Sequence, residues 1–203
     1  MNELETFELF IDEAREEDGI EAISLVEFPA IEENFVALSK HKVEFKTVDT
    51  EKRVIVGLAL VPDKPIYRRS GDKEYNIIFS KETVRKASEL YLKRLKLNNA
   101  TLEHDEQMTS GVSVIESWIV EDPEFDKSKK YGLEVPEGTW MVSMKVDDKD
   151  VWDNYVKDNK VFGFSIEGKF ANVLRKEKSD MNFSDQVLDG TLELIKQFLK
   201  DNY

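Results

Sequence analysis

Short apolar runs rich in β-branched residues recur along this chain, separated by polar stretches. The clearest runs are residues 54–61, 111–120, 139–146 and 161–170. β-Branched and aromatic side chains favour extended strands, and polar segments with glycine or proline between such runs are typical of turns. Because residues 54–61 are apolar almost throughout, we expect that run to be a central strand buried on both faces.

Two helices are expected within this series of strands, and a third after it. Ser80 is a suitable cap for a helix that runs to about residue 97. Its predicted core face carries Val84, Ala87, Tyr91 and Leu95. Asp147 or Asp148 would cap a short second helix, and residues 184–199 form an amphipathic third one. Strands with few helices predict an α+β protein built on a mostly antiparallel sheet or barrel.

The chain divides into three parts by composition. Residues 1–19 form an acidic N-terminal extension, residues 20–174 form the main domain, and residues 175–203 form a charged linker followed by the C-terminal amphipathic helix. The acidic start resembles neither a secretory signal nor a transit peptide. No run approaches the roughly 18 apolar residues that a membrane-spanning helix needs, so no membrane partner is expected.

Charge and cysteine content exclude several classes of protein. The formal net charge of −13 argues against a nucleic-acid partner, because affinity for the phosphate backbone comes from clustered lysine and arginine. The chain has no cysteine, which excludes disulfides, a thiolate nucleophile and zinc sites built on cysteine. A glycine-rich loop of the kind that holds a phosphate is also missing from the sequence. We therefore expect no metal and no cofactor.

Only two histidines are available as bases near neutral pH. His41 lies in a polar, lysine-flanked segment and is expected to be exposed. His104 lies in ATLEHDEQMTSG, just before a strong strand. A lone histidine among acidic residues is also typical of a merely solvated side chain, so His104 alone decides nothing.

Ser165 is a candidate nucleophile in the segment GFSIEG, where Gly163 and Gly168 flank it. Glycine within a strand often marks a bulge or a close approach of the backbone, which oxyanion-binding N–H groups require. The segment is not the G-x-S-x-G elbow, because residue 167 is glutamate and strand-like sequence continues. Taken alone, the pattern also fits an ordinary strand serine.

Five segments in order resemble the prohead (capsid-maturation) serine proteases of tailed phages. They are EAISLVEFPAIEENFVAL, VGLALVPDKPIYR, TLEHDEQMTSGVSVIESWIVEDPEFDKS, GTWMVSMKVDDKDVW and VFGFSIEGKF. The similarity is strongest to the putative phage serine proteases of defective prophages in Gram-positive bacteria. It extends over about residues 20–174, with residues 102–128 and 138–170 the most specific.

The resemblance implies a β-barrel with surrounding helices, related to the herpesvirus assemblins. It implies Ser/His catalysis with Ser165 as nucleophile and His104 as base. A third member should orient the imidazole. Glu116, on the strand after His104, is the first choice. Glu167 is the second, because it shares a strand face with Ser165.

The implied function is a serine endopeptidase of phage head maturation. Its expected substrates are the scaffold protein, the major capsid protein and the enzyme itself, inside the assembling prohead in the host cytoplasm. A homo-oligomer is also expected. Alternatives are a catalytically inactive, protease-like structural or assembly protein of the head, an esterase, and an assembly chaperone that binds through its acidic surface.

Overall fold

A computed structural model gives the fold, and it describes residues 4–27, 46–49 and 51–175. The chain divides into two units, Met1–Val173 and Leu174–Tyr203. The first unit holds nearly all of the described residues, and the account below concerns it. The C-terminal helix expected over residues 184–199 lies outside the described residues, as does His41.

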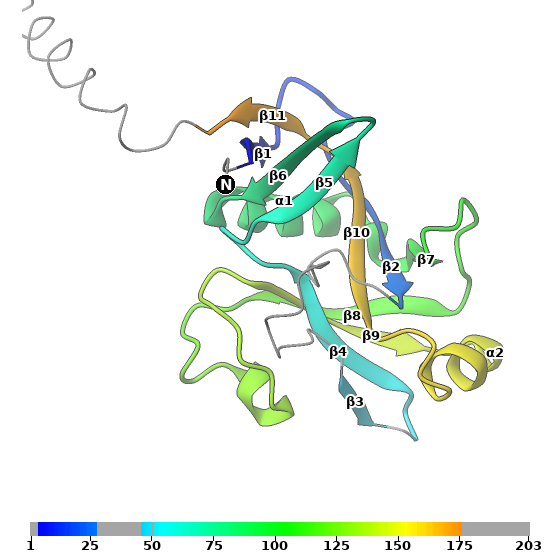
Figure 1. The fold of residues 1–203 in the computed structure, drawn as a ribbon. Helices are drawn as coiled ribbons and strands as arrows, with labels where there is room; N and C mark the ends of the chain where they lie inside the picture. The colour runs from blue at the N-terminus through cyan, green and yellow to red at the C-terminus, as the bar shows by residue number, and fades with distance from the viewer. Residues whose placement is uncertain (1–3, 28–45, 50, 176–203) are drawn as a thin grey trace, which may run out of the picture. The chain divides into compact units, whose positions relative to one another are not determined.

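The described strands form three sheets (Figure 1). The first has the order β11-β1-β6-β5, the second β10-β2-β7 and the third β3-β4-β9-β8. The strands are β1 Thr6–Phe10, β2 Gly19–Val26, β3 Lys46–Asp49, β4 Val54–Leu60, β5 Ile66–Ser70, β6 Lys73–Phe79, β7 Ala100–Leu102, β8 Val112–Ile119, β9 Trp140–Val146, β10 Gly163–Lys169 and β11 Ala171–Leu174. The helices are α1 Lys81–Lys93, the 3-10 turns η1 Lys96–Asn98 and η2 Lys127–Tyr131, and the consecutive short helices α2 Lys149–Val151 and η3 Trp152–Val156.

The expected α+β class is confirmed, whereas the expected barrel is not. Within the described residues, the three sheets are separate and none closes on itself. β1 pairs with β6 in parallel and β2 pairs with β7 in parallel, alongside the antiparallel pairs of the third sheet. The N-terminal stretch contributes β1, so part of the acidic segment is a strand between β11 and β6.

The third sheet bears out the strongest sequence patterns. β4 lies between β3 and β9, and Ile55 through Leu60 are buried, as expected for a central strand. β9 is buried along most of its length, including Trp140 and Met144. The sequence of β5, IYRRS, has little apolar content. It forms a strand by pairing with β6 in a hairpin.

Helix α1 begins where the sequence predicts and ends earlier. The Ser80 hydroxyl oxygen accepts a hydrogen bond from the Thr83 backbone N–H at 3.4 Å, which caps the first turn. Val84, Ala87 and Tyr91 are buried against the sheets. The placement of Leu95 on the core face is wrong. Its φ is 56° and it is 80 % exposed, because the helix has already ended at Lys93.

Tyr91 provides a stability test of this core. Its ring packs edge-on against Trp140 with a centroid distance of 5.5 Å, and its buried hydroxyl has no hydrogen-bond partner within the described part of the chain. Burial raises the pKa of the Tyr91 phenol. Tyr91→Phe should therefore raise the free energy of unfolding by about 1 kcal/mol, because it removes an unpaired buried donor. Thermal denaturation would check this, and a lower melting temperature would show that the hydroxyl is paired.

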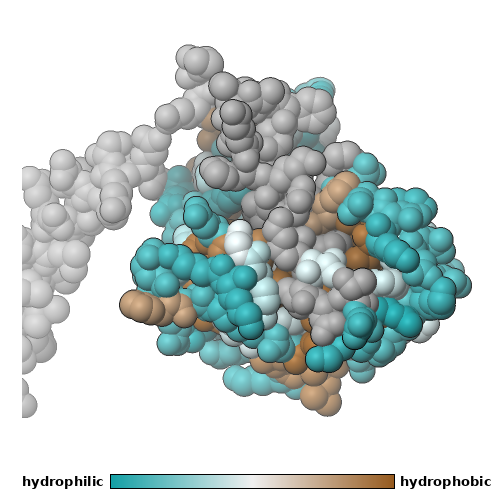
Figure 2. Space-filling model, turned by 90° about the horizontal axis from the view of Figure 1, so that it is seen from below, coloured by the Kyte–Doolittle hydropathy of each residue, from teal (hydrophilic) through white to brown (hydrophobic). Residues whose placement is uncertain are grey.

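Polar side chains dominate the face of the molecule drawn in Figure 2, and apolar ones gather in patches between them. This pattern agrees with the formal net charge of −13. Among the described helices, none combines the length and the apolar composition needed to cross a bilayer.

Candidate active site

The sheet β10-β2-β7 lines up three buried hydroxyl side chains. Ser165 on β10 is paired with Ser24 on β2, and Ser24 is paired with Thr101 on β7. Residues directly opposite each other on neighbouring strands project to the same face of a sheet. All three are buried, and Ser165 is 5 % exposed. The apolar residues next to them in sequence, such as Phe164 and Leu25, belong to the hydrophobic core.

His104 lies in a tight turn directly after β7. The Asp105 N–H donates to the Leu102 carbonyl at 2.9 Å, and the two residues between them, Glu103 and His104, have φ of 50° and 59°. This combination is typical of a type I′ turn, which normally holds glycine or asparagine. A left-handed conformation costs roughly 1–2 kcal/mol for each residue with a Cβ. The turn therefore contains backbone strain at two adjacent positions.

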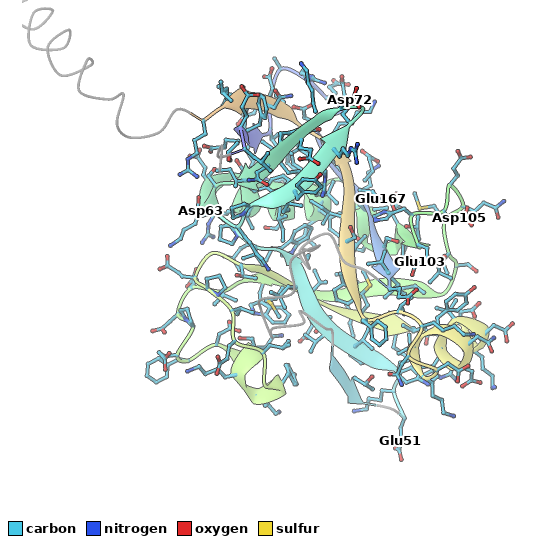
Figure 3. All side chains as sticks on the ribbon, in the orientation of Figure 1. Glu51, Asp63, Asp72, Glu103, Asp105 and Glu167 are labelled. Atoms are coloured by element: carbon cyan, nitrogen blue, oxygen red, sulfur yellow. The ribbon has the colours of Figure 1, made fainter. Side chains whose placement is uncertain are left out.

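Hydrogen bonds to β2 and to the residue after it hold this strained turn in place, including one from the Glu103 N–H to the Leu25 carbonyl at 3.0 Å. The His104 backbone N–H donates to Ser24 Oγ at 3.0 Å. The Glu103 carboxylate accepts from the Glu27 backbone N–H at 2.6 Å, just past the end of β2. Figure 3 shows Glu103 and Asp105 in the loop after β7, on the side of the molecule where Glu167 extends from β10. Strain that is held by specific contacts in this way is typical of functional sites.

Glu167 connects the strand of Ser165 to the imidazole of His104. Its Oε1 lies 3.1 Å from His104 Nδ1 and also accepts a hydrogen bond from the Thr101 hydroxyl. Glu167 follows Ser165 by two residues, and the bulge in β10 comes only after Glu167. The two side chains therefore share one strand face. With Nδ1 facing the carboxylate, Nε2 is the nitrogen left to act as a base.

Ser165 and the turn that holds His104 lie on either side of Ser24, because β2 runs between β10 and β7. Opposed side chains in an antiparallel pair have Cβ atoms roughly 4.5–5.5 Å apart, and Ser24, the partner of Ser165, contacts the His104 backbone. Within the described residues, the Ser165 hydroxyl forms no hydrogen bond, with His104 or with any other group. Catalytic pairs are often separated in structures without substrate and tighten when substrate binds.

Gly168, one of the two glycines that flank Ser165, lies where the backbones of two strands come close together. A Cβ at Gly168 would lie 2.2 Å from the Gly19 backbone oxygen, so the close approach belongs to the contact between β10 and β2. The register shifts between Glu167 and Gly168, as expected for a bulge. The glycine therefore serves the bulge that ends the regular ladder just beyond Glu167.

Glu116, the first choice for the third member, contacts a different group of side chains. Its carboxylate accepts a hydrogen bond from Ser143 Oγ and forms an ion pair with Lys127 at 3.0 Å. Lys127 in turn lies over the Trp118 ring, 3.7 Å from its centroid. The Ser143 hydroxyl and then Lys127 lower the pKa of Glu116 below its usual range. β8 directs Glu116 to β9 and η2, whereas β10 directs Glu167 to the turn that carries His104.

The two glutamates make a matched pair of variants. Glu167→Gln should lower kcat by about 10²- to 10⁴-fold, because an amide does not hold the imidazole in the tautomer that a base requires. Glu116→Gln should leave kcat unchanged. Near neutral pH, Glu116→Gln should lower the free energy of unfolding by less than about 1 kcal/mol, because the ion pair that it removes is exposed. In acid it should have no effect on stability, because the native carboxyl is already protonated there. Steady-state kinetics would check this, and the reverse order of effects would restore Glu116.

Ser24 and Thr101 are the site residues that sequence reasoning missed. Both are hydroxyl side chains at buried strand positions, where an apolar residue is more usual. A polar residue in an otherwise apolar strand can be recognised from the sequence. The partners of Ser24 and Thr101 are known only from the structure, in which β2 lies between β10 and β7. No group of three or more histidine, aspartate and glutamate side chains in the described part of the chain is arranged to hold a metal ion.

Comparison with known protein families gives a match over most of the chain. Residues 42–174 match the family model described as "Putative phage serine protease XkdF". The matched span contains His104, Ser165 and Glu167, and it begins later than the expected resemblance from residue 20. No curated protein and no solved structure gave a significant match. Since the model covers well over half of the sequence, the chain belongs to this family of phage serine proteases.

Proposed function

We propose that this chain is a serine endopeptidase, with Ser165 as nucleophile, His104 as general base and Glu167 as the residue that orients the imidazole. The observation that carries this assignment is the 3.1 Å contact between Glu167 and His104, made from the same strand face as Ser165. The strained turn at His104 and the hydroxyl of Thr101, which fixes Glu167, support it further.

The proposed reaction follows from these positions. Ser165 Oγ attacks the carbonyl carbon of the scissile peptide bond, and its proton passes to His104 Nε2. The tetrahedral oxyanion then collapses, the C–N bond breaks, and the departing amine takes the proton from His104. Water then attacks the carbonyl carbon of the resulting ester and gives its proton to His104. The ester C–Oγ bond breaks, His104 returns the proton to Ser165 Oγ, and the acid is released. Glu167 stabilises the imidazolium that forms in both halves. No cofactor is needed.

The proposed setting is head maturation in the infected host cell. The substrates would be the scaffold protein, the major capsid protein and the protease itself, inside the assembling prohead. Membership of a phage serine protease family supports this setting. Self-association of the enzyme is part of the proposal, so assays should cover a range of protein concentrations.

The test combines cleavage with labelling of the nucleophile. Purified protein is incubated with the cognate capsid and scaffold proteins, both free and assembled, and the products are read by intact mass. In parallel, a fluorophosphonate probe is added, and peptide mapping locates the phosphonylated residue. We expect discrete fragments and a label on Ser165. Ser143→Ala is the matched control, because Ser143 is a buried serine on a strand of another sheet and is bonded to a carboxylate.

Each alternative function predicts a different outcome. An inactive structural protein would give neither fragments nor label under any assembly condition. An esterase would be labelled and would hydrolyse small esters, but would leave the capsid and scaffold chains intact. A label on another serine would reject Ser165 as nucleophile while keeping the protease.

A further inference from the structure

A cavity of about 210 Å³, lined mostly by apolar residues, lies beside Ser165. Its walls come from three sheets: Leu9 on β1, Ile77 and Phe79 on β6, Leu60 on β4, and Phe170 just after β10. Arg68 on β5 also contributes, and its Nη1 donates to the Tyr67 carbonyl at 2.9 Å. The cavity is smaller than the roughly 300–1,000 Å³ that whole small ligands occupy, and its size suits one large side chain.

The cavity follows the edge of β10 and does not lie over one face of that strand. Ser165 and Ile166 both line it, although consecutive strand residues project to opposite faces. β10 pairs with β2 along one edge, and no strand within the described residues pairs with the other. A strand edge of this kind presents backbone N–H and C=O groups that an extended peptide can pair with.

A wider groove continues from the cavity across the first sheet. This groove has a volume of about 620 Å³ and shares Leu9, Arg68 and Ile77 with the cavity. Phe7 and Tyr75, which pack edge-on at 5.6 Å, line the groove but not the cavity. Phe7 and Tyr75 therefore belong to the groove alone, which allows the cavity to be tested separately from it.

We propose that the cavity is the specificity subsite of the protease, which receives a large aliphatic or aromatic side chain next to the scissile bond of an extended substrate. The substrate backbone pairs with the edge of β10 opposite β2, which brings its carbonyl to Ser165, and its adjacent side chain enters the cavity. This inference rests on the proposed function. It adds that the enzyme selects Leu, Ile, Met or Phe over Ala or a charged residue at one position.

The experiment measures binding and cleavage separately. Blocked eight-residue peptides carry Ala, Val, Leu, Phe or Asp at one central position and Ser or Thr elsewhere. Binding to the inactive Ser165→Ala protein is measured by calorimetry, and cleavage by the active protein is read by mass spectrometry. We expect the Leu or Phe peptide to bind, and to be cleaved, at least about tenfold better than the Ala peptide, the order of discrimination that apolar pockets achieve.

Two phenylalanines provide matched variants for the subsite. Phe170 lines the cavity and packs edge-on against Phe79 at 5.0 Å, whereas Phe7 makes an equivalent pair with Tyr75 outside it. Both are partly buried, so their replacement by alanine should cost similar stability. Phe170→Ala should remove most of the preference for Leu over Ala, and Phe7→Ala should retain it.

The two readouts separate failure of the subsite from failure of the proposed function. Cleavage without side-chain preference, or a preference that Phe170→Ala leaves unchanged, would overturn the subsite and keep the protease. Selective binding of the Leu peptide without any cleavage would keep the subsite and overturn the proposed function. Equal binding of the Ala and Leu peptides by Ser165→Ala would reject the subsite whatever the activity.

Discussion

Replacing Ser165 by alanine should lower kcat by about 10⁴- to 10⁶-fold, the loss seen when a serine protease loses its nucleophile. The fold should be unaffected. Ser165 is 5 % exposed, and its hydroxyl has no hydrogen bond to the described residues, so its removal breaks no hydrogen bond to them. The free energy of unfolding should therefore change by less than about 1 kcal/mol. Loss of activity at unchanged stability would therefore identify a chemical role for Ser165.

Kinetics and thermal denaturation on the same samples would check this prediction. Ser24→Ala is an instructive comparison, because Ser24 is the buried serine opposite Ser165 and accepts the His104 backbone N–H. Its replacement should destabilise the protein by roughly 1–3 kcal/mol, since it leaves that N–H unpaired. A Ser165→Ala protein that cleaves at the wild-type rate would show that another residue is the nucleophile.

The long apolar strands and the caps of the helices were predictable from sequence because their signals are local. The Ser80 cap, β4, β8 and β9 needed only residue type and period. β7 has three residues, so it gives no periodic signal, and it forms by pairing in parallel with the distant β2. The separate sheets, in place of a closed barrel, likewise depend on pairings between residues far apart in the sequence.

The candidate site shows the same division between local and distant signals. Glu167 could be placed near Ser165, because a separation of two residues on one strand fixes a shared face. The position of Glu116 relative to His104 could not be predicted in this way. β8 and β7 belong to different sheets, and sequence spacing does not fix how two sheets lie relative to each other. The left-handed turn at Glu103 and His104 was not predictable, because neither residue is among the glycine and asparagine that such turns favour.

Glycine at position 104 should separate the chemical role of the histidine from its backbone strain. His104→Gly and His104→Ala should both lower kcat by about 10³- to 10⁶-fold, because both remove the base. Glycine adopts φ of 59° without strain, whereas alanine does not. The glycine variant should therefore be more stable than the alanine variant by about 1 kcal/mol, after the greater freedom of glycine in the unfolded chain offsets part of the relief. In a chain of this size that difference corresponds to about 2–4 °C in Tm.

Leu95 supplies the matched control for this strain argument. It has φ of 56°, is 80 % exposed and lies at the end of α1, so Leu95→Gly should raise stability by about 1 kcal/mol and leave kcat unchanged. We expect His104→Gly to gain stability and lose activity, and Leu95→Gly to gain stability and keep activity. That pair of results would show that the turn after β7 holds a strained residue for its chemistry. Equal stability of His104→Gly and His104→Ala would mean that residue 104 is not left-handed in solution. A His104→Ala protein that keeps its activity would remove the histidine from the mechanism.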